Sequence, residues 1–393
     1  ARNDNQVSTL KVAILIDDAT RCTPAHLILP LLLESLEQAG VLPAHISIVI
    51  ALGTHRPMTP KEIITKVGPQ LANHETSPYP LINDNSTHAT SYMGTSQNGI
   101  PAHVQPAVAN AHLKIGVGQI LPHMNAGYSG GGKIVLPGVC SSVTVETFHA
   151  QEVQMTENLL GNLESPIRRD LEQFVEECVG LDFIVNVIMT ADHQLYKCVA
   201  GHFIQAHRVG VQYAQEIYGV PVPRKYPIVV ASAYPKDMDL WQATTAIAAG
   251  EIMLEQQQQQ QGTTTTRSTL IVVAHAWDRH SAYPDFAHRM GQDPQELQAQ
   301  FEADNIPQSS SKMTTIFGIS MGRYRQKFQM ALVSEGLTKQ DADTMGFLYH
   351  ETIEEAVEVA RQRCGDPQAP VGILTHGGIT LPLLGPVGED PQD

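Results

Sequence analysis

The chain has 393 residues, of which 42% are hydrophobic and 17% are charged, and its formal net charge at pH 7 is −15. This length predicts two or three domains, each large enough for its own core. The acidic charge, without a stripe of lysine and arginine, argues against a nucleic-acid binder. No apolar run has the length of a membrane span and no signal peptide precedes the first predicted strand. We therefore expect a cytoplasmic protein that contacts no membrane.

The cysteines and histidines narrow the possible chemistry. The five cysteines are scattered and odd in number, which predicts reduced thiols rather than a disulfide framework or a cysteine-based zinc site. The seventeen histidines are numerous for this composition. Most are expected at the surface or in packing, and a few are candidates for metal ligands or acid–base groups.

The first half of the chain alternates apolar strands with helices. Residues 24–40 predict a helix with Thr23 as its N-cap and Pro24 at its first position. Another helix begins at a capping box formed by Thr59 and Glu62. The predicted buried strands cover residues 10–17, 46–53 and 112–120. This alternation predicts a parallel sheet that is covered on both faces.

A second series of strands and helices begins near residue 225. Strands are predicted at residues 225–235 and 269–277, and helices near residues 238–255, 322–333 and 351–363. The glutamine run 256–261 predicts a solvated bulge at a helix end. The proline-rich segment 218–227 predicts a linker, and the apolar run 371–384 predicts a strand that returns to the first domain.

These patterns predict an α/β protein with two α/β domains, mainly parallel sheets and an active-site crevice between the domains. Residues 1–221 together with residues 369–393 form the first predicted domain. Residues 222–368 form the second.

The segment NAGYSGGGKIVLPG, residues 125–138, contains a lysine lined by glycines. Gly127 to Lys133 matches the beginning of a phosphate loop, but Ile134 stands where that loop requires serine or threonine. Pro137 would interrupt the helix that has to begin at the lysine. The pattern therefore disfavours an ordinary nucleoside-triphosphate site.

Three polar loops, residues 17–21, 53–56 and 121–133, each follow a predicted buried strand. In open α/β sheets ligands bind outside the carboxyl ends of the strands, so these loops should converge. Taken singly, Asp18 and Arg21 could form a surface ion pair, and His55, His123 and His149 could be ordinary surface or loop histidines. Together they predict a pocket suited to a carboxylate, to proton transfer or to a transition metal.

These loops resemble the lactate racemase family. The patterns that match are D-x-T-R, G-x-H-R-P-x-T and H-x-x-A-G-[FY]-S-G-G-x-K-x-x-x-P-G, with a histidine sixteen residues after that lysine. The spacing of His123, Lys133 and His149 makes the match specific. The likeness runs from about residue 10 to the C-terminus and is weaker beyond residue 220.

The resemblance implies a nickel-pincer nucleotide, nickel pyridinium-3,5-bisthiocarboxylic acid mononucleotide, bound covalently through Lys133. His149 would be the protein ligand of nickel, since square-planar nickel held by the pincer has one position left. The first domain would bind this cofactor, and the second would close over the substrate. The other cofactor-binding residues implied are Asp18, Thr20, Tyr128, Ser129, Gly130 and Gly131.

The implied activity is that of an isomerase that racemises or epimerises a small-molecule 2-hydroxy acid at C2. In the family's route a histidine takes the hydroxyl proton while the Cα hydrogen passes as hydride to the pincer ring, through a 2-keto acid. His55 and His123 match the acid–base pair, and Arg21 and Gln242 match substrate-binding residues. Cofactor-biosynthesis enzymes are the implied protein partners.

The sequence departs from the family at several positions near the substrate. The family pattern Gln-x-x-Lys is represented here by Gln242 and Thr245, and Ala19 and Gly132 replace a histidine and an arginine. The loss of a cation puts lactate itself in question as the substrate. Trp241, beside Gln242, could shape the pocket or belong to the core.

Two other functions stay open from the sequence. A zinc hydrolase could use His55, His123 and His149 as ligands, although zinc sites usually have a tightly spaced ligand pair. A non-catalytic protein could bind the nickel-pincer cofactor through Lys133 and His149, but it would need no acid–base pair. Metal and mass analysis would distinguish the zinc hydrolase from a nickel-pincer enzyme of the lactate racemase family. Turnover of a 2-hydroxy acid would distinguish that enzyme from the non-catalytic cofactor-binding protein.

Overall fold

The structure is a computed structural model of the chain, and it describes residues 9–84, 86–255 and 268–385. The chain divides into two compact units. Unit 1 comprises Ala1–Leu121, Tyr128–Phe148 and Leu163–Glu216, and unit 2 comprises Pro122–Gly127, His149–Asn162 and Ile217–Asp393. Within the described ranges, no helix has the length and apolarity that crossing a membrane requires.

Unit 1 contains a six-stranded sheet in the order β10-β9-β6-β1-β2-β3. All neighbouring strands are parallel except β9 and β10, which form an antiparallel hairpin. The bounds are β1 (Val12–Asp17), β2 (Ile46–Ala51), β3 (Leu81–Ile82), β6 (Leu113–Gln119), β9 (Phe183–Met189) and β10 (Leu195–Gly201). The three buried strands predicted in the first half of the chain are confirmed.

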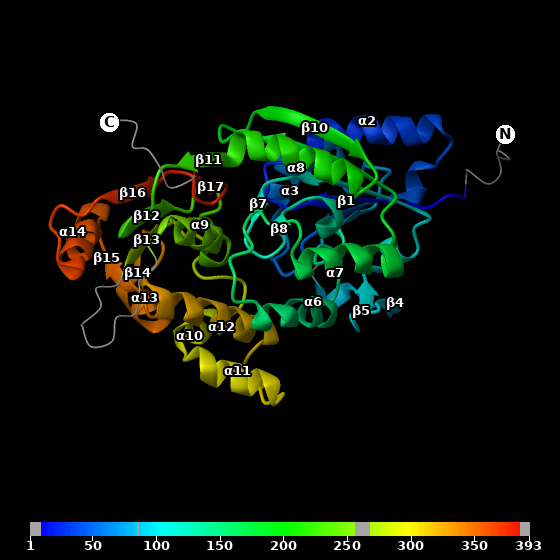
Figure 1. Cartoon of the computed structure of the whole chain (residues 1–393). Coiled ribbons are helices and arrows are strands. Elements are labelled where there is room, and N and C mark those ends of the chain that lie inside the picture. The colour runs from blue at the N-terminus through cyan, green and yellow to red at the C-terminus, as the bar shows by residue number, and fades with distance from the viewer. Residues whose placement is uncertain (1–8, 85, 256–267, 386–393) are drawn as a thin grey trace. The chain divides into compact units, whose positions relative to one another are not determined.

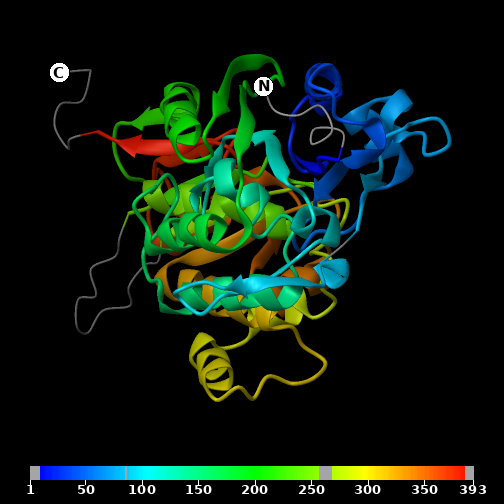
Figure 2. The same ribbon diagram turned by 90° about the vertical axis from the view of Figure 1, so that its right-hand side faces the viewer.

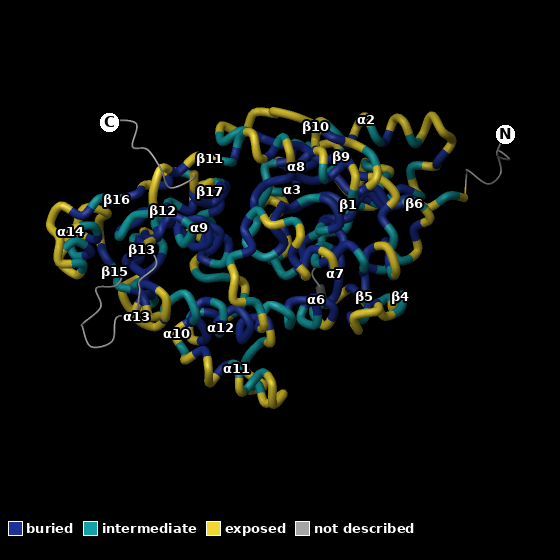
Figure 3. The backbone as a smooth tube through the Cα atoms, viewed as in Figure 1, coloured by how far each residue is buried: buried dark blue, intermediate teal, exposed yellow. Residues whose placement is uncertain are grey.

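Two helices, α2 (Ala25–Gln38) and α3 (Pro60–Val67), cover one face of this sheet (Figure 1). Every second residue of β1 and β2 joins them in one apolar core, as Ile14 and Ile48 do with Leu29 and Ile63. Figure 3 shows β1 and β6 in dark blue, whereas α2 is largely yellow with teal stretches, since one side of the helix is exposed. The pattern is that of a parallel strand buried on both faces beside a surface helix.

The opposite face of the sheet receives the glycine segment. A Cβ added at Gly116 of β6 would lie 2.9 Å from Ile134 Cγ2, so glycine permits this close packing. The helical elements elsewhere in this part of the chain are α4 (Pro69–Ala72), α5 (Pro106–Ala109), α6 (Ser142–His149), α7 (Pro166–Phe174) with a π-helical turn at Val175–Val179, and α8 (Gln205–Tyr218). Short strands are β4 (Ser91–Thr95), β5 (Pro101–Val104), β7 (Pro122–His123) and β8 (Gly127–Tyr128), and short 3-10 turns lie at Pro43–His45, Ser86–His88 and Ala150–Gln154.

Unit 2 contains a five-stranded parallel sheet in the order β15-β14-β13-β12-β16. The strands are β12 (Ile228–Ser232), β13 (Thr269–Val273), β14 (Gln329–Val333), β15 (Leu348–His350) and β16 (Val371–Leu374), and β11 (Gly219–Val222) pairs with β17 (Leu381–Leu384). The helices are α9 (Leu240–Met253), α10 (Phe286–Gly291), α11 (Pro294–Glu302), α12 (Lys312–Lys327), α13 (Lys339–Met345) and α14 (Ile353–Cys364). The helices α10 and α11 lie beside α12 in both Figure 1 and Figure 2.

The predicted domain limits are wrong in two places. The run 371–384 does not return to the first domain, because β16 pairs with β12 and β17 with β11, which places described residues 369–385 in unit 2. Residues 122–127 and 149–162, predicted in the first domain, also belong to unit 2. Arg323 of α12 donates to the carbonyls of Val153 and Met155, which fastens the second segment there. The glutamine run 256–261 lies outside the described residues.

Candidate active site

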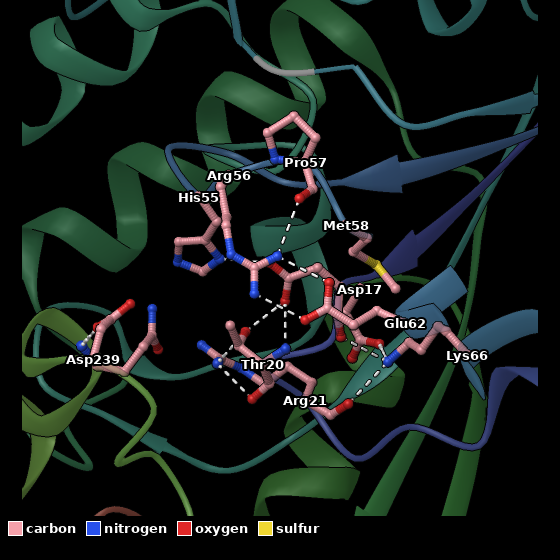
Figure 4. Close-up of polar contacts among 12 residues, drawn as sticks. Asp17, Thr20, Arg21, His55, Arg56, Pro57, Met58, Glu62, Lys66 and Asp239 are labelled. Carbon is pink, nitrogen blue, oxygen red and sulfur yellow. Dashed lines mark hydrogen bonds and ion pairs between the residues drawn. The ribbon is translucent and has the colours of Figure 1, made fainter. Parts of the chain in front are cut away.

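The loop after β1 is fastened by the buried carboxylate of Asp17. Lys66 of α3 places its ammonium 2.6 Å from Asp17 Oδ1 and donates to the carbonyls of Asp18 and Arg21, each at 2.9 Å. The N–H of Gln119, the last residue of β6, donates to Asp17 Oδ2 at 3.0 Å. This buried pair holds residues 18–21 at the carboxyl end of the sheet, as Figure 4 shows.

His55 and Asp18 form a carboxylate–imidazole pair. His55 Nδ1 lies 2.6 Å from Asp18 Oδ2, and the His55 side chain is 28% exposed. Burial raises the pKa of Asp18, but the His55 imidazole, Arg21 and the Thr20 hydroxyl outweigh it and hold that pKa below its ordinary value. A carboxylate only accepts hydrogen bonds, so Nδ1 carries a proton. In the neutral ring Nε2 is then unprotonated and can accept a proton.

Thr20 and Arg21 belong to the same cluster. The Thr20 hydroxyl donates to Asp18 Oδ1 at 2.5 Å, and its N–H donates to the same oxygen at 3.0 Å. The Arg21 guanidinium donates to the carbonyl of Thr20 at 3.1 Å and to its hydroxyl at 2.9 Å. An imidazole, a carboxylate and a guanidinium are therefore held on two adjacent loops (Figure 4).

Arg56, which follows His55, has a structural partner. Its guanidinium donates to both carboxylate oxygens of Glu62, each at 2.9 Å. This pairing with Arg56 is the main reason that the pKa of Glu62 is lowered to about 2. Glu62 also completes the predicted capping box with Thr59 at the start of α3. The loop that carries His55 is thus attached to the helix that carries Lys66.

Lys133 lies in a short 3-10 helix, Gly131–Ile134, and not at the start of an α-helix, in line with the disfavoured phosphate loop. Gly130 and Gly131 have φ of +77° and +57°, which glycine adopts without strain. A Cβ at Gly130 would lie 2.7 Å from Asn186 Oδ1, and one at Gly131 would lie 3.0 Å from His207 Cγ. Packing within unit 1 therefore requires these glycines, and Lys133 itself is half-buried.

Tyr128 and Ser129 lie inside unit 1 and position this turn. Burial raises the pKa of Tyr128 to about 12, and its carbonyl accepts a hydrogen bond from buried Arg168. The Ser129 hydroxyl donates to the Gln119 carbonyl at 2.7 Å. Nε2 of His207 lies 2.8 Å from the Ser129 carbonyl, and burial keeps the pKa of His207 well below its usual value. Neutral His207 therefore donates this bond.

Within unit 1, hydrogen bonds join the loop after β1, the loop after β2 and the residues from Tyr128 onward that follow β6, whereas residues 122–127 of the predicted third loop belong to unit 2. Gly53, after β2, donates its N–H to the Gly138 carbonyl at 2.8 Å. Gln119 connects the other two loops, because its N–H donates to Asp17 and its carbonyl accepts from Ser129. The predicted residues Asp18, Thr20, Arg21, His55, Tyr128, Ser129, Gly130, Gly131 and Lys133 all lie on these loops.

His123 lies in unit 2, in a turn whose backbone amides face its ring. The N–H groups of Asn125 and Ala126 donate to His123 Nδ1 at 3.2 and 3.4 Å. Nδ1 is therefore an acceptor, and in the neutral ring the proton lies on Nε2. This tautomer is the opposite of the one that Asp18 imposes on His55.

His149, also in unit 2, is buried and has a carboxylate partner. Its Nδ1 lies 2.5 Å from Glu152 Oε1, and the same oxygen accepts from Asn125 Nδ2 at 2.8 Å. A carboxylate on Nδ1 leaves Nε2 as a ligand, and such pairs are common around protein-bound metals. Glu152 thus links the predicted metal ligand to the turn that carries His123.

Gln242 is buried in the first turn of α9, where its N–H donates to Asp239 Oδ1 at 2.7 Å. Its neighbour Trp241 stacks on Phe317 with ring centroids 4.5 Å apart, and on Tyr283 at 5.5 Å. Trp241 therefore belongs to an aromatic cluster of unit 2, which supports a role in the core rather than in shaping the pocket.

Over the part of the chain that the structure describes, no group of three or more histidine, cysteine, aspartate and glutamate side chains is arranged to hold a metal ion. The zinc-hydrolase alternative, which needs such a group, gains no support. A metal that takes most of its ligands from an organic cofactor needs only one protein ligand.

Comparison with known proteins identifies the family. Residues 4–160 match the lactate racemase N-terminal domain. The lactate racemase of Lactiplantibacillus plantarum is 30% identical over 372 residues, covering 93% of this chain and 83% of that protein. The lactate racemase of Thermoanaerobacterium thermosaccharolyticum is 31% identical over 243 residues, or 61% of this chain and 56% of that protein. The chain belongs to the lactate racemase family.

Solved structures confirm the fold of this family member. The lactate racemase apoprotein from Thermoanaerobacterium thermosaccharolyticum superposes with a TM-score of 0.81 at 23% identity, covering 98% of this chain and 89% of that one. A protein from Thermotoga maritima superposes with a TM-score of 0.72 at 18% identity, covering 97% of both chains. The predicted α/β fold with mainly parallel sheets is confirmed, and the chain is an isomerase of the lactate racemase family.

The contacts made by this lactate racemase family member fit a metal-bearing nucleotide at two points. His149 has its Nδ1 on Glu152, which suits Nε2 for coordination. Lys133 is half-buried on a turn whose backbone is held by the surrounding packing. Asp18 and Thr20, predicted to bind the cofactor, contact His55 and Arg21, so they position those side chains whatever else they bind.

Sequence reasoning missed the residues that hold the predicted ones. Glu152 follows His149 by three residues, a spacing at which helical side chains meet, so it could have been found. Lys66 carries no comparable signal. Its contact with Asp17 depends on how α3 packs against β1.

Proposed function

We propose that this enzyme racemises or epimerises a 2-hydroxy acid at C2 through a 2-keto acid, with a nickel-pincer nucleotide tethered to Lys133. The observation that carries the proposal is the Asp18–His55 pair beside Arg21, which places a base and a carboxylate-binding group on adjacent loops. The two curated lactate racemases support this class of reaction. Thr245 in place of the family's lysine favours a substrate other than lactate.

The roles of the side chains follow from what C2 inversion requires. The Cα–H bond of a 2-hydroxy acid is very weakly acidic, so its hydrogen leaves as hydride rather than as a proton. When bound, the nucleotide would supply the acceptor for that hydride. Arg21 binds the substrate carboxylate through paired hydrogen bonds, and Gln242 binds a second polar group. His55 accepts the hydroxyl proton at Nε2, while His123 serves the substrate oxygen in the opposite orientation.

The same proposal assigns residues to the cofactor. Lys133 would form the covalent link, and His149, oriented by Glu152, would offer Nε2 to nickel. The backbone around Tyr128, Ser129, Gly130 and Gly131, together with Asp18 and Thr20, completes the cofactor-binding set. Cofactor-biosynthesis enzymes would load the chain in the cytoplasm.

One experiment tests the proposal and its alternatives. The chain is co-expressed with cofactor-making enzymes and incubated with a panel of single-enantiomer 2-hydroxy acids, while metal content and intact mass are measured. We expect nickel, a mass increase that Lys133→Ala abolishes, and formation of the opposite enantiomer. Zinc without added mass would favour the hydrolase, and a loaded protein without turnover would favour the cofactor carrier.

A further inference from the structure

The first turn of α9 lacks a cation that the family pattern contains. Gln242 is present, but Thr245 stands three residues later where the pattern has lysine. Both side chains are buried, at 7% and 5% exposure. Residues three apart in a helix lie on the same face, so the missing charge belongs beside Gln242.

Lys236 brings an ammonium group to the same place from another element. It follows β12 in a turn where its N–H donates to the Ala233 carbonyl at 2.8 Å. Its side chain is 4% exposed. Its Nζ lies 3.5 Å from Thr245 Oγ1 and 3.3 Å from the Pro122 carbonyl. The charge absent from position 245 is therefore present next to it, within unit 2.

The location of this ammonium suits a ligand. Lys236 follows the carboxyl end of a central parallel strand, where open α/β sheets bind ligands. Pro122 immediately precedes His123, so the charge lies beside the peptide that carries a proposed acid–base residue. In a buried setting the attraction between an ammonium and a carboxylate is much stronger than in water.

We propose that Lys236 is a substrate-binding residue that replaces the family's lysine and takes a carboxylate of the 2-hydroxy acid. This inference rests on the proposed function. The Thr245 hydroxyl positions the ammonium, which explains why a short polar residue is compatible with that site. A lysine ammonium is a point charge without a bidentate preference. It therefore suits either the C1 carboxylate or a second carboxylate on the C3 substituent.

The test moves the cation between the two positions. Lys236→Met is compared with the double variant Lys236→Met/Thr245→Lys, and with Lys339→Met at the exposed start of α13. The cofactor-loaded proteins are assayed for kcat and KM with monocarboxylic and dicarboxylic 2-hydroxy acids. The apoproteins are titrated calorimetrically with the corresponding 2-keto acids, and Tm is measured for each.

We expect Lys236→Met to raise KM and the 2-keto acid Kd about 10- to 100-fold, as loss of a charged hydrogen bond does. Tm should stay unchanged, the double variant should recover most of the affinity, and Lys339→Met should match the wild type. An effect with both substrate classes assigns Lys236 to the C1 carboxylate, and an effect with dicarboxylic acids alone assigns it to the second one.

A wild-type KM and Kd in Lys236→Met would overturn the inference. So would a lower kcat and Tm at unchanged KM, since the ammonium would then support the fold rather than bind the substrate. If Lys236→Met does not fold, Thr245→Val keeps the side-chain volume and removes the hydroxyl contact. It should raise KM several-fold at unchanged Tm, and an unchanged KM there rejects the idea. A wild type without turnover refutes the proposed function instead, while the 2-keto acid titration still tests Lys236.

Discussion

The two histidines proposed for proton transfer lie in contrasting surroundings. His55, in unit 1, faces a carboxylate, since its Nδ1 lies 2.6 Å from Asp18 Oδ2. His123, in unit 2, faces backbone amides, since Asn125 and Ala126 donate to its Nδ1. When both rings are neutral, Nε2 of His55 is unprotonated and Nε2 of His123 carries the proton. The two rings therefore present different groups at Nε2.

Because their tautomers differ, the two histidines enter the first step of the proposed reaction in different states. His55 can accept a hydroxyl proton at once, while His123 first serves as a hydrogen-bond donor to the substrate oxygen. To accept a proton at Nε2, His123 has to turn its Nδ1 away from the two amides that cap it. At equilibrium the two enantiomers of a substrate with one stereocentre are equally populated, so the asymmetry has to be sought in single turnovers.

The largest expected effect comes from removing each histidine in turn. His55→Ala and His123→Ala should both stop racemisation, because the full cycle uses both. With the enantiomer whose hydroxyl faces His55, His55→Ala should slow 2-keto acid formation about 10²- to 10⁴-fold, whereas His123→Ala should still form it. Single-turnover absorbance measures this, and the roles should exchange with the other enantiomer. Equal rates for both variants with both enantiomers would contradict the two-histidine mechanism.

A smaller effect is expected from Asp18→Asn, which makes the surroundings of His55 more like those of His123. The asparagine amide can donate to Nδ1 of His55, so the proton of the neutral ring would move to Nε2 while the shape of the site is kept. We expect a loss of about 10²-fold, the lower end of acid–base assistance, with the enantiomer that faces His55. The half-reaction with the opposite enantiomer is the internal control. Equal losses with both enantiomers, across the pH profile, would show that Asp18 acts on something other than the His55 tautomer.

The smallest effect concerns stability against pH. The pKa of Asp18 in the fold lies below its ordinary value of 3.8. Its ionised form therefore stabilises the fold above that ordinary value, and the contribution is lost as the pH falls toward the folded pKa. Wild type should lose stability relative to Asp18→Asn below about pH 4, by on the order of 1–2 kcal/mol. Urea unfolding at pH 7 and pH 3 checks this, and an unchanged difference would speak against an ionised Asp18.

Local patterns predicted some elements well and others poorly. The capping box of Thr59 and Glu62 begins α3 because both partners lie within one helical turn. Thr23 does not cap α2 as predicted. Its hydroxyl donates to Asp17 Oδ2 at 2.5 Å, and Pro24 takes the N-cap position. The helix predicted at 322–333 is wrong in its second half, since Gln329–Val333 pairs with β13 as strand β14. In both cases a distant partner outweighed the local preference.

The sequence by itself determined the parallel strands and the polar loops that follow them, and it supplied the residues that we propose to bind a ligand. Apolar runs and turn residues determine local structure through neighbours only a few positions away, so they can be recognised from the sequence alone. Only the tertiary structure decided which ring nitrogen of His55 and of His123 is unprotonated, because the groups that set each tautomer depend on how the loops are packed. It alone also brought the ammonium of Lys236 to Thr245 and Pro122. Such contacts join residues far apart in the chain, and no local pattern encodes them.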